Sequence, residues 1–290
     1  MDVDGRMLVD EMEPHTLLAA AVIGLFIGFL GGLLGKGGSA IATPLLHAVG
    51  VPAIIAVAAP LPATIPSTLA ASWVYWKERY LDFGIVRTCV IWGVPATIVG
   101  ALATRWISGN LLVSLTDVVL VGIGLRLLRR HAAPEETVTP VGSVESIVEE
   151  LPAGGGVALA TRPTITAAVT TAPSTRMLAL VAVLVGLSAG LLANSGGFLL
   201  APLMITLVKL PIRPALATSL AVSAVLAIPG TIVHAALGHI DWTLVAVFAA
   251  TSVPLSFAGA RVALRMDAQR LERIYGAVLV LLGATFLILR

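Results

Sequence analysis

Charged residues are scarce in this chain of 290 residues: Asp, Glu, Lys and Arg together make up 12% of it. A soluble domain carries about twice that share, because charged groups wet its surface. This scarcity excludes a soluble enzyme, a nucleic-acid-binding domain and a disordered chain. The 58% of apolar residues and the mean hydropathy of +0.99 instead indicate a polytopic membrane protein, with apolar residues for roughly eight spans of ~20 residues.

Cysteine, a targeting signal and cofactor motifs are also lacking. Cys89 is the only cysteine, so the chain cannot form an internal disulfide. Most of the charged residues in 1–13 are acidic, whereas the n-region of a signal peptide is positively charged. We therefore expect the first apolar stretch to stay in the protein. No P-loop and no metal-binding His/Cys motif occurs. We therefore predict no cofactor, no metal and no nucleic-acid partner.

The apolar residues fall into ten stretches, most of them long enough to cross a bilayer as helices. They lie at about 16–35, 39–49, 53–76, 83–104, 111–128, 177–193, 197–208, 212–237, 242–264 and 274–289. Two stretches, 39–49 and 197–208, are too short to cross, and each follows a glycine-rich break. We predict that these two are half-helices in an all-α polytopic membrane protein.

The chain divides into two similar halves. We predict a polar N-terminal tail at 1–15, a first membrane repeat at 16–130, a polar linker rich in Pro, Gly and Glu at 131–176, and a second membrane repeat at 177–290. A shift of 158 residues, or 159 after one insertion, superposes Gly32 on Gly190, Pro44 on Pro202, Asp82 on Asp241, Pro95 on Pro254 and Gly100 on Gly259. A duplication with helices broken at matching places is typical of secondary transporters.

Basic residues in short loops mark the cytoplasmic side of a membrane protein. Three basic groups occur, at 77–79, 126–130 and 261–273. If all three are cytoplasmic, equivalent points of the two halves lie on opposite sides. This favours inverted repeats of about five helical segments each, with both termini outside, although parallel repeats stay open.

The glycine-rich breaks at 31–39 and 190–197 are the first candidate site. Helix N-termini offer free N–H donors and about half a positive charge, which suits an anion. The candidate binding residues here are Lys36, Gly37, Gly38, Ser39, Asn194, Ser195, Gly196 and Gly197. Gly24 and Gly28 fit a packing ridge between helices instead.

Hydroxyl residues form a second candidate group. Three prolines within residues 60–66 predict an opened backbone there, and hydroxyls in this stretch and its counterpart could bind an oxyanion. The candidates are Thr64, Ser67, Thr218, Ser219 and Ser223. Bonding to carbonyls of their own helix is an equal alternative.

Other polar residues have separate interpretations. Asp82 and Asp241 each precede a long span and are predicted helix N-caps. Asp117 and His234 could relay protons, or could lie at the level of the headgroups.

With these motifs the sequence resembles the sulfite exporter TauE/SafE family, also called the toluene-sulfonate uptake permease family. The likeness rests on the two glycine runs leading to Pro44 and Pro202, and on the stretch from Ala217-Thr218-Ser219-Leu220 to His239-Ile240-Asp241-Trp242. It implies a secondary transporter in the bacterial plasma membrane that moves sulfite, sulfoacetate or other sulfonates, usually outward, by alternating access without ATP. The chain departs from the family pattern at Lys36, Ser39, Asn194 and Ser195, which leaves the particular anion open.

The partners expected are therefore a small sulfur-containing anion, membrane lipid and a coupling ion, H+ or Na+, with a homodimer left open. An anion channel and a non-transporting membrane scaffold are the competing interpretations. An intramembrane protease with Ser195 as nucleophile is disfavoured, because Gly37 stands at the matching position of the other copy. We predict that the chain is not an enzyme.

Overall fold

The computed structural model describes residues 14–35, 39–103, 122, 125, 174–191 and 195–288. Within these ranges every regular element is a helix, which agrees with the predicted all-α class. Most of the predicted span at 111–128 and of the predicted linker at 131–176 lies outside the described residues.

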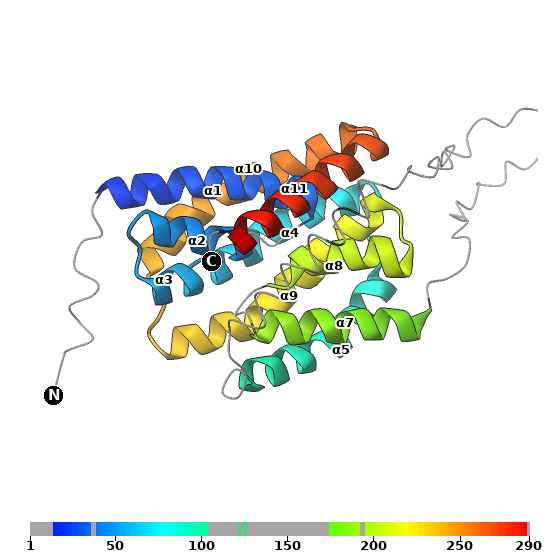
Figure 1. The fold of residues 1–290 in the computed structure, drawn as a ribbon, viewed down its shortest axis with the longest axis horizontal. Coiled ribbons are helices and arrows are strands. Elements are labelled where there is room, and N and C mark those ends of the chain that lie inside the picture. The colour runs from blue at the N-terminus through cyan, green and yellow to red at the C-terminus, as the bar shows by residue number, and fades with distance from the viewer. Residues whose placement is uncertain are drawn as a thin grey trace, which may run out of the picture.

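Each half contributes a similar series of helices (Figure 1). The first half holds α1 (Pro14–Leu34), α2 (Ser39–Ala48), α3 (Ala53–Ala58), α4 (Pro60–Lys77) and α5 (Phe83–Ala103). The second half holds α7 (Thr175–Leu191), α8 (Gly197–Leu203), the π-helical turn η1 (Met204–Val208), α9 (Ile212–Ala236), α10 (Trp242–Arg265) and α11 (Ala268–Ile288). Five segments of the described chain are long and apolar enough to span a membrane: α1, Ile54–Lys77, α5, α9 and α10.

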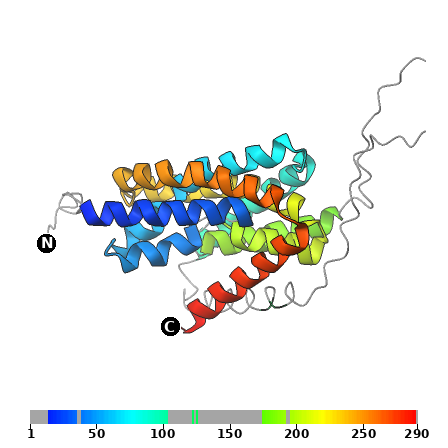
Figure 2. The same ribbon diagram turned by 90° about the horizontal axis from the view of Figure 1, so that it is seen from above.

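Both predicted half-helices are present, as α2 and as α8 continued by η1. Figures 1 and 2 show α2 and α8 starting near the middle of the molecule and running towards opposite ends. The two N-termini therefore lie at mid-depth of the bundle.

Helix α9 is fully enclosed along part of its length. Residues 215–220, more than a full turn, each have 0% of their surface exposed, so this part of the helix is covered on all faces. It packs on α4, α5 and α8, and α4 packs in turn on α10. The middle of α9 is therefore the centre of the protein.

The two halves are joined by two matching helix pairs, α1 with α10 and α5 with α7. A methyl group added at Gly28 would overlap the backbone of Ser252, and one added at its counterpart Gly186 would overlap that of Gly93. The same relation holds for Gly32 with Ser256, and for Gly190 with Thr97. These contacts confirm that the glycines of α1 form a packing ridge, and the second half repeats the ridge in the same register.

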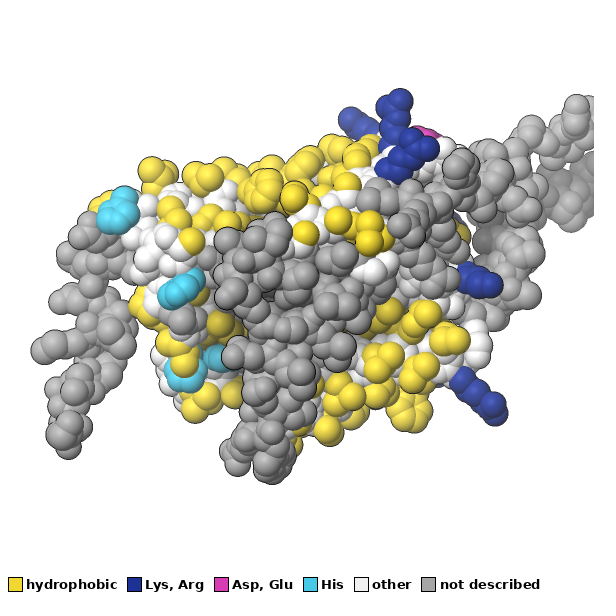
Figure 3. All heavy atoms as spheres, viewed as in Figure 1, with side chains coloured by type: hydrophobic (Ala, Val, Ile, Leu, Met, Phe, Trp, Pro, Cys, Tyr) yellow, Lys and Arg dark blue, Asp and Glu magenta, His cyan; other side chains and the backbone are white. Residues whose placement is uncertain are grey.

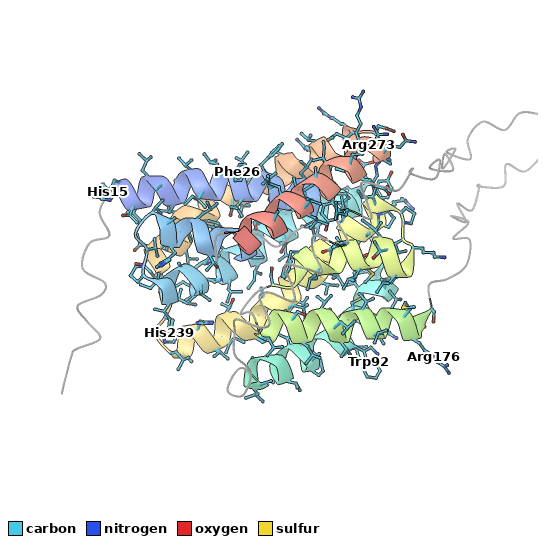
Figure 4. The ribbon with its side chains drawn as sticks, in the orientation of Figure 1. His15, Phe26, Trp92, Arg176, His239 and Arg273 are labelled. Carbon is cyan, nitrogen blue, oxygen red and sulfur yellow. The ribbon has the colours of Figure 1, made fainter. Side chains whose placement is uncertain are left out.

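The face of the molecule drawn in Figure 3 has two different ends. Between an end with Lys and Arg and an end with His, the figure shows apolar side chains along the upper and lower parts of the molecule. Phe26 and Trp92, which Figure 4 labels, are about half exposed and are placed to face lipid. Figure 4 also places His15 at the start of α1 and Arg176 at the start of α7 at opposite ends, so these two helices run in opposite directions.

The proline-rich stretch differs from its prediction. Pro60, Pro62 and Pro66 do not open the backbone, because α4 runs unbroken from Pro60 to Lys77. Pro60 and Pro62 fall in the first turn, where the backbone N–H has no helical acceptor to lose. Only Pro66 lies inside the helix.

Both predicted N-caps are confirmed. The Asp241 carboxylate accepts a hydrogen bond of 2.9 Å from the backbone N–H of Leu244. The Asp82 carboxylate accepts one of 2.7 Å from Gly84 and one of 3.3 Å from Ile85, at the start of α5.

The close helix contacts predict that Gly32→Ala destabilises the protein. The added methyl group would meet the Ser256 carbonyl and push α1 away from α10. We expect a loss of about 1–3 kcal/mol in the free energy of unfolding, measured by thermal melting in detergent. Gly122→Ala is the matched control, because no atom of the described residues lies within 4 Å of the position of the added Cβ there. Equal melting temperatures for the two variants would contradict the packing ridge.

Candidate functional site

The two glycine-rich breaks meet at one side chain, Ser219 of α9. Its Oγ lies 2.8 Å from the carbonyl oxygen of Gly35, at the end of α1, and 3.0 Å from that of Gly197, at the start of α8. Ser219 has no exposed surface. The breaks of both halves therefore lie side by side in the buried centre of the protein.

Glycine is required where the chain turns at these breaks. Gly35 and Gly196 have φ angles of +65° and +71°, a left-handed conformation that L side chains rarely adopt. A Cβ at Gly35 would also press on Leu216 of α9, and one at Gly196 on Val185 of α7. The turns therefore need glycine both for backbone conformation and for close packing.

Thr218 and Ser223 of α9 flank this meeting point. Both are fully buried, and their hydroxyl oxygens have no hydrogen-bond partner in the part of the chain that the structure describes. A buried hydroxyl without a partner costs about 1–3 kcal/mol. Two such hydroxyls, without a partner among the described residues, therefore lie on the helix that touches both breaks.

Thr64 and Ser67 of α4 are in a different situation. The Thr64 hydroxyl donates to the Pro60 carbonyl at 2.8 Å, and the Ser67 hydroxyl donates to the Thr64 carbonyl at 3.2 Å. These bonds match the back-bonding alternative noted for hydroxyl residues in helices. Each side chain would have to give up its bond before it could donate to an anion.

The other candidates are spread over the chain. Ser195 is fully buried beside Gly196, and Ser39 begins α2. His234 lies in the last turn of α9, away from the breaks, with its Nδ1 atom 3.3 Å from that of His239. Lys36, Gly37, Gly38, Asn194 and Asp117 lie outside the described residues.

Sequence reasoning missed two serines of α10. The Ser256 hydroxyl donates to the Ser67 carbonyl of α4 at 2.8 Å, and the Ser252 hydroxyl, also buried, has no partner in the described ranges. Their spacing of four residues around Pro254 places both on one face, and this was the available signal.

Comparison with known proteins identifies the family. The profile described as "Sulfite exporter TauE/SafE" matches residues 20–286, almost the whole chain. The chain belongs to the TauE/SafE family. The resemblance stated from the sequence is thereby confirmed, and the glycine breaks, the half-helices and Ser219 all lie inside the matched region.

Relatives of this TauE/SafE protein are named as transporters. A "Probable membrane transporter protein" of Xylella fastidiosa (strain 9a5c) is 25% identical over 285 residues, which cover 93% of this chain and 94% of the relative. The "Probable membrane transporter protein YunE" of Bacillus subtilis (strain 168) is 23% identical over 280 residues, covering 92% and 96%. The "Probable membrane transporter protein YjnA" of the same organism is 24% identical over 274 residues, covering 90% and 96%. No solved structure matches the chain.

The family and the apolar helices make this chain a multi-pass membrane transporter and not an enzyme.

The position of Ser219 predicts that Ser219→Ala loosens both breaks at once. The variant leaves the Gly35 and Gly197 carbonyls without this donor, which costs about 1–3 kcal/mol of stability. Backbone amide hydrogen exchange should rise at both breaks together. Ser188→Ala is the control, because the Ser188 hydroxyl bonds only within its own helix, to the Leu184 carbonyl. Faster exchange at one break alone would show that Ser219 does not join them.

Proposed function

We propose that this TauE/SafE protein is a secondary transporter that exports small sulfur-containing anions, such as sulfite, sulfoacetate or other sulfonates, across the bacterial plasma membrane. The observation that carries the proposal is the meeting of both breaks at Ser219, between the unpartnered hydroxyls of Thr218 and Ser223. The family match supports the anion class.

The chemistry of this centre suits an oxyanion. A sulfonate or sulfite group loses its hydration in the membrane, so fixed donors must replace its water. Thr218 and Ser223 supply two neutral donors, and the N-terminus of α2 supplies free N–H groups and a partial positive charge. Lys36, in the segment before α2, adds a full charge in this proposal.

Alternating access of two inverted repeats is the proposed mechanism. Two observations support the inversion: α1 and α7 run in opposite directions, and α2 and α8 run towards opposite ends. The repetition of the α1–α10 contacts between α5 and α7 supports the duplication itself. In this arrangement each half can rock against the other around the middle of α9.

A gradient of H+ or Na+ would supply the energy in this proposal. Asp117 and His234 remain the proposed proton carriers. His234 is half-buried at one end of α9, so it would exchange protons at the mouth and not at the centre.

Transport assays on Thr218→Val and Ser223→Ala test the site. Each variant removes one donor to the anion, and a hydrogen bond to a charged group is worth about 1.5–3 kcal/mol. We expect sulfite or sulfonate flux in proteoliposomes to fall roughly ten- to hundredfold. Thr231→Val is the matched control on the same helix, because the Thr231 hydroxyl already donates to the Ala227 carbonyl at 2.9 Å. Flux at the control level in both site variants would refute their role.

Lys36→Met and Ser219→Ala complete this test. If both leave sulfonate flux intact, the assignment of the site to the breaks fails. Electrical recording under a concentration gradient then distinguishes a carrier from a channel, since a channel conducts without counterflow or coupling.

Orientation can be tested with single cysteines. In a Cys89→Ala background, Arg273→Cys should react with a membrane-impermeant maleimide only from the cytoplasmic side, because basic residues gather at its end of the molecule. His15→Cys, at the opposite end, should react from outside. Labelling of both positions from one side would contradict the proposed orientation.

A further inference from the structure

The turn after α9 holds two histidine side chains against each other. The backbone N–H of His239 donates to the His234 carbonyl at 3.0 Å, and that of Gly238 donates to the Ala235 carbonyl at 3.1 Å. Gly238 has a φ angle of +70°. This pair of bonds with a left-handed glycine is the Schellman cap, which brings the side chains at its two ends into contact.

In most such caps the two side chains in contact are apolar. Here they are the imidazoles of His234 and His239, both half-buried. Their ring centroids lie 5.5 Å apart with the planes tilted by 54°, so the rings are not stacked. Their Nδ1 atoms instead form a hydrogen bond of 3.3 Å, in which one ring donates its Nδ1–H to the Nδ1 atom of the other, and a bound ion would replace this proton. The cap therefore presents two nitrogen ligand atoms at a fixed spacing.

This spacing matches a metal chelate. Two imidazole nitrogens bound to one tetrahedral ion at about 2.0–2.1 Å lie roughly 3.3 Å apart. We propose that His234 and His239 form a binding site for a divalent transition-metal ion, of the class of Zn2+, Ni2+ or Cu2+ that imidazole ligands favour. The proposal is independent of the anion transported, but it is an alternative to the proton-carrier role of His234, because a nitrogen that binds a metal ion cannot also accept a proton.

The site is open and exchangeable. Among the described residues no cluster of three or more His, Cys, Asp or Glu side chains occurs, so the described part of the chain supplies two ligands, and in this proposal water takes further coordination positions. Structural zinc sites, by contrast, use four protein ligands. His239 lies at the end of the molecule opposite Arg176 and Arg273 (Figure 4), so these cations do not oppose the ion.

A bound ion would join the last turn of α9 to the residues that lead into α10. His239 stands two residues before the N-cap Asp241 of α10. The ion would therefore hold the α9–α10 turn closed and raise the melting temperature, by an amount that grows with the logarithm of the ion concentration above its dissociation constant.

Metal titration of the full chain tests the site. The protein is purified in detergent without a polyhistidine tag and titrated with ZnCl2 by calorimetry. We expect one ion per chain in the wild type, and affinity at least about tenfold lower in both His234→Gln and His239→Gln, since each loses one ligand. His47→Gln is the matched control: His47 is a surface histidine of α2 whose Nδ1 contacts the Val51 carbonyl, and this variant should bind as the wild type does.

Electron paramagnetic resonance of bound Cu2+ gives a second readout that does not need the variants to fold. Two coordinated imidazole nitrogens in the wild-type spectrum would support the site. Three results would overturn the site: a spectrum with one coordinated nitrogen, unchanged affinity in both His→Gln variants, or no binding at millimolar metal. In the last case the two rings only share a hydrogen bond.

Discussion

In lipid, burying apolar side chains gives helices little reason to associate, so this transporter depends on helix backbones that touch. Gly28 and Gly32 bring α1 against the backbone of α10, and Gly186 and Gly190 do the same for α7 and α5. Each contact joins one half of the chain to the other. The helices of each half therefore pack mainly on helices of the other half. The middle of α9 is enclosed as a result.

Because the middle of α9 is enclosed, the polar groups around it need hydrogen-bond partners within the protein. Interruption of a helix leaves backbone groups without partners, and at mid-depth no water replaces them. The single proton of the Ser219 hydroxyl is shared between the Gly35 and Gly197 carbonyls, so one residue of α9 contacts the interrupted helices of both halves. Thr218 and Ser223, on either side, have no hydrogen-bond partner among the described residues, which is why the proposed function places the substrate beside them.

Features that depend on residues close together in the sequence could be predicted from it. Half-helices at 39–49 and 197–208, the caps at Asp82 and Asp241, and the ridge of Gly24 and Gly28 follow from local length, spacing and residue type. The bridge at Ser219 could not be predicted, because it joins residues 184 positions apart. The predicted opening of the backbone at Pro60, Pro62 and Pro66 was wrong, because the effect of a proline depends on its distance from the start of the helix. The exact residue at which a helix starts is difficult to predict from a sequence. The histidine contact depends on one left-handed glycine.

The two halves differ in the hydrogen bonds that join α4 and α9 to their neighbouring helices. The Ser256 hydroxyl of α10 donates to the Ser67 carbonyl of α4. In the other half, the residue that corresponds to Ser256 is Thr97, whose hydroxyl donates to the Gly93 carbonyl within its own helix, α5. The residue that corresponds to Ser67 is Leu226 of α9. A rocking motion that separates α10 from α4 must break a bond that the opposite motion does not. In the proposed alternating-access mechanism, this bond would stabilise one access state and not the other, so the two states would differ in free energy even without a gradient.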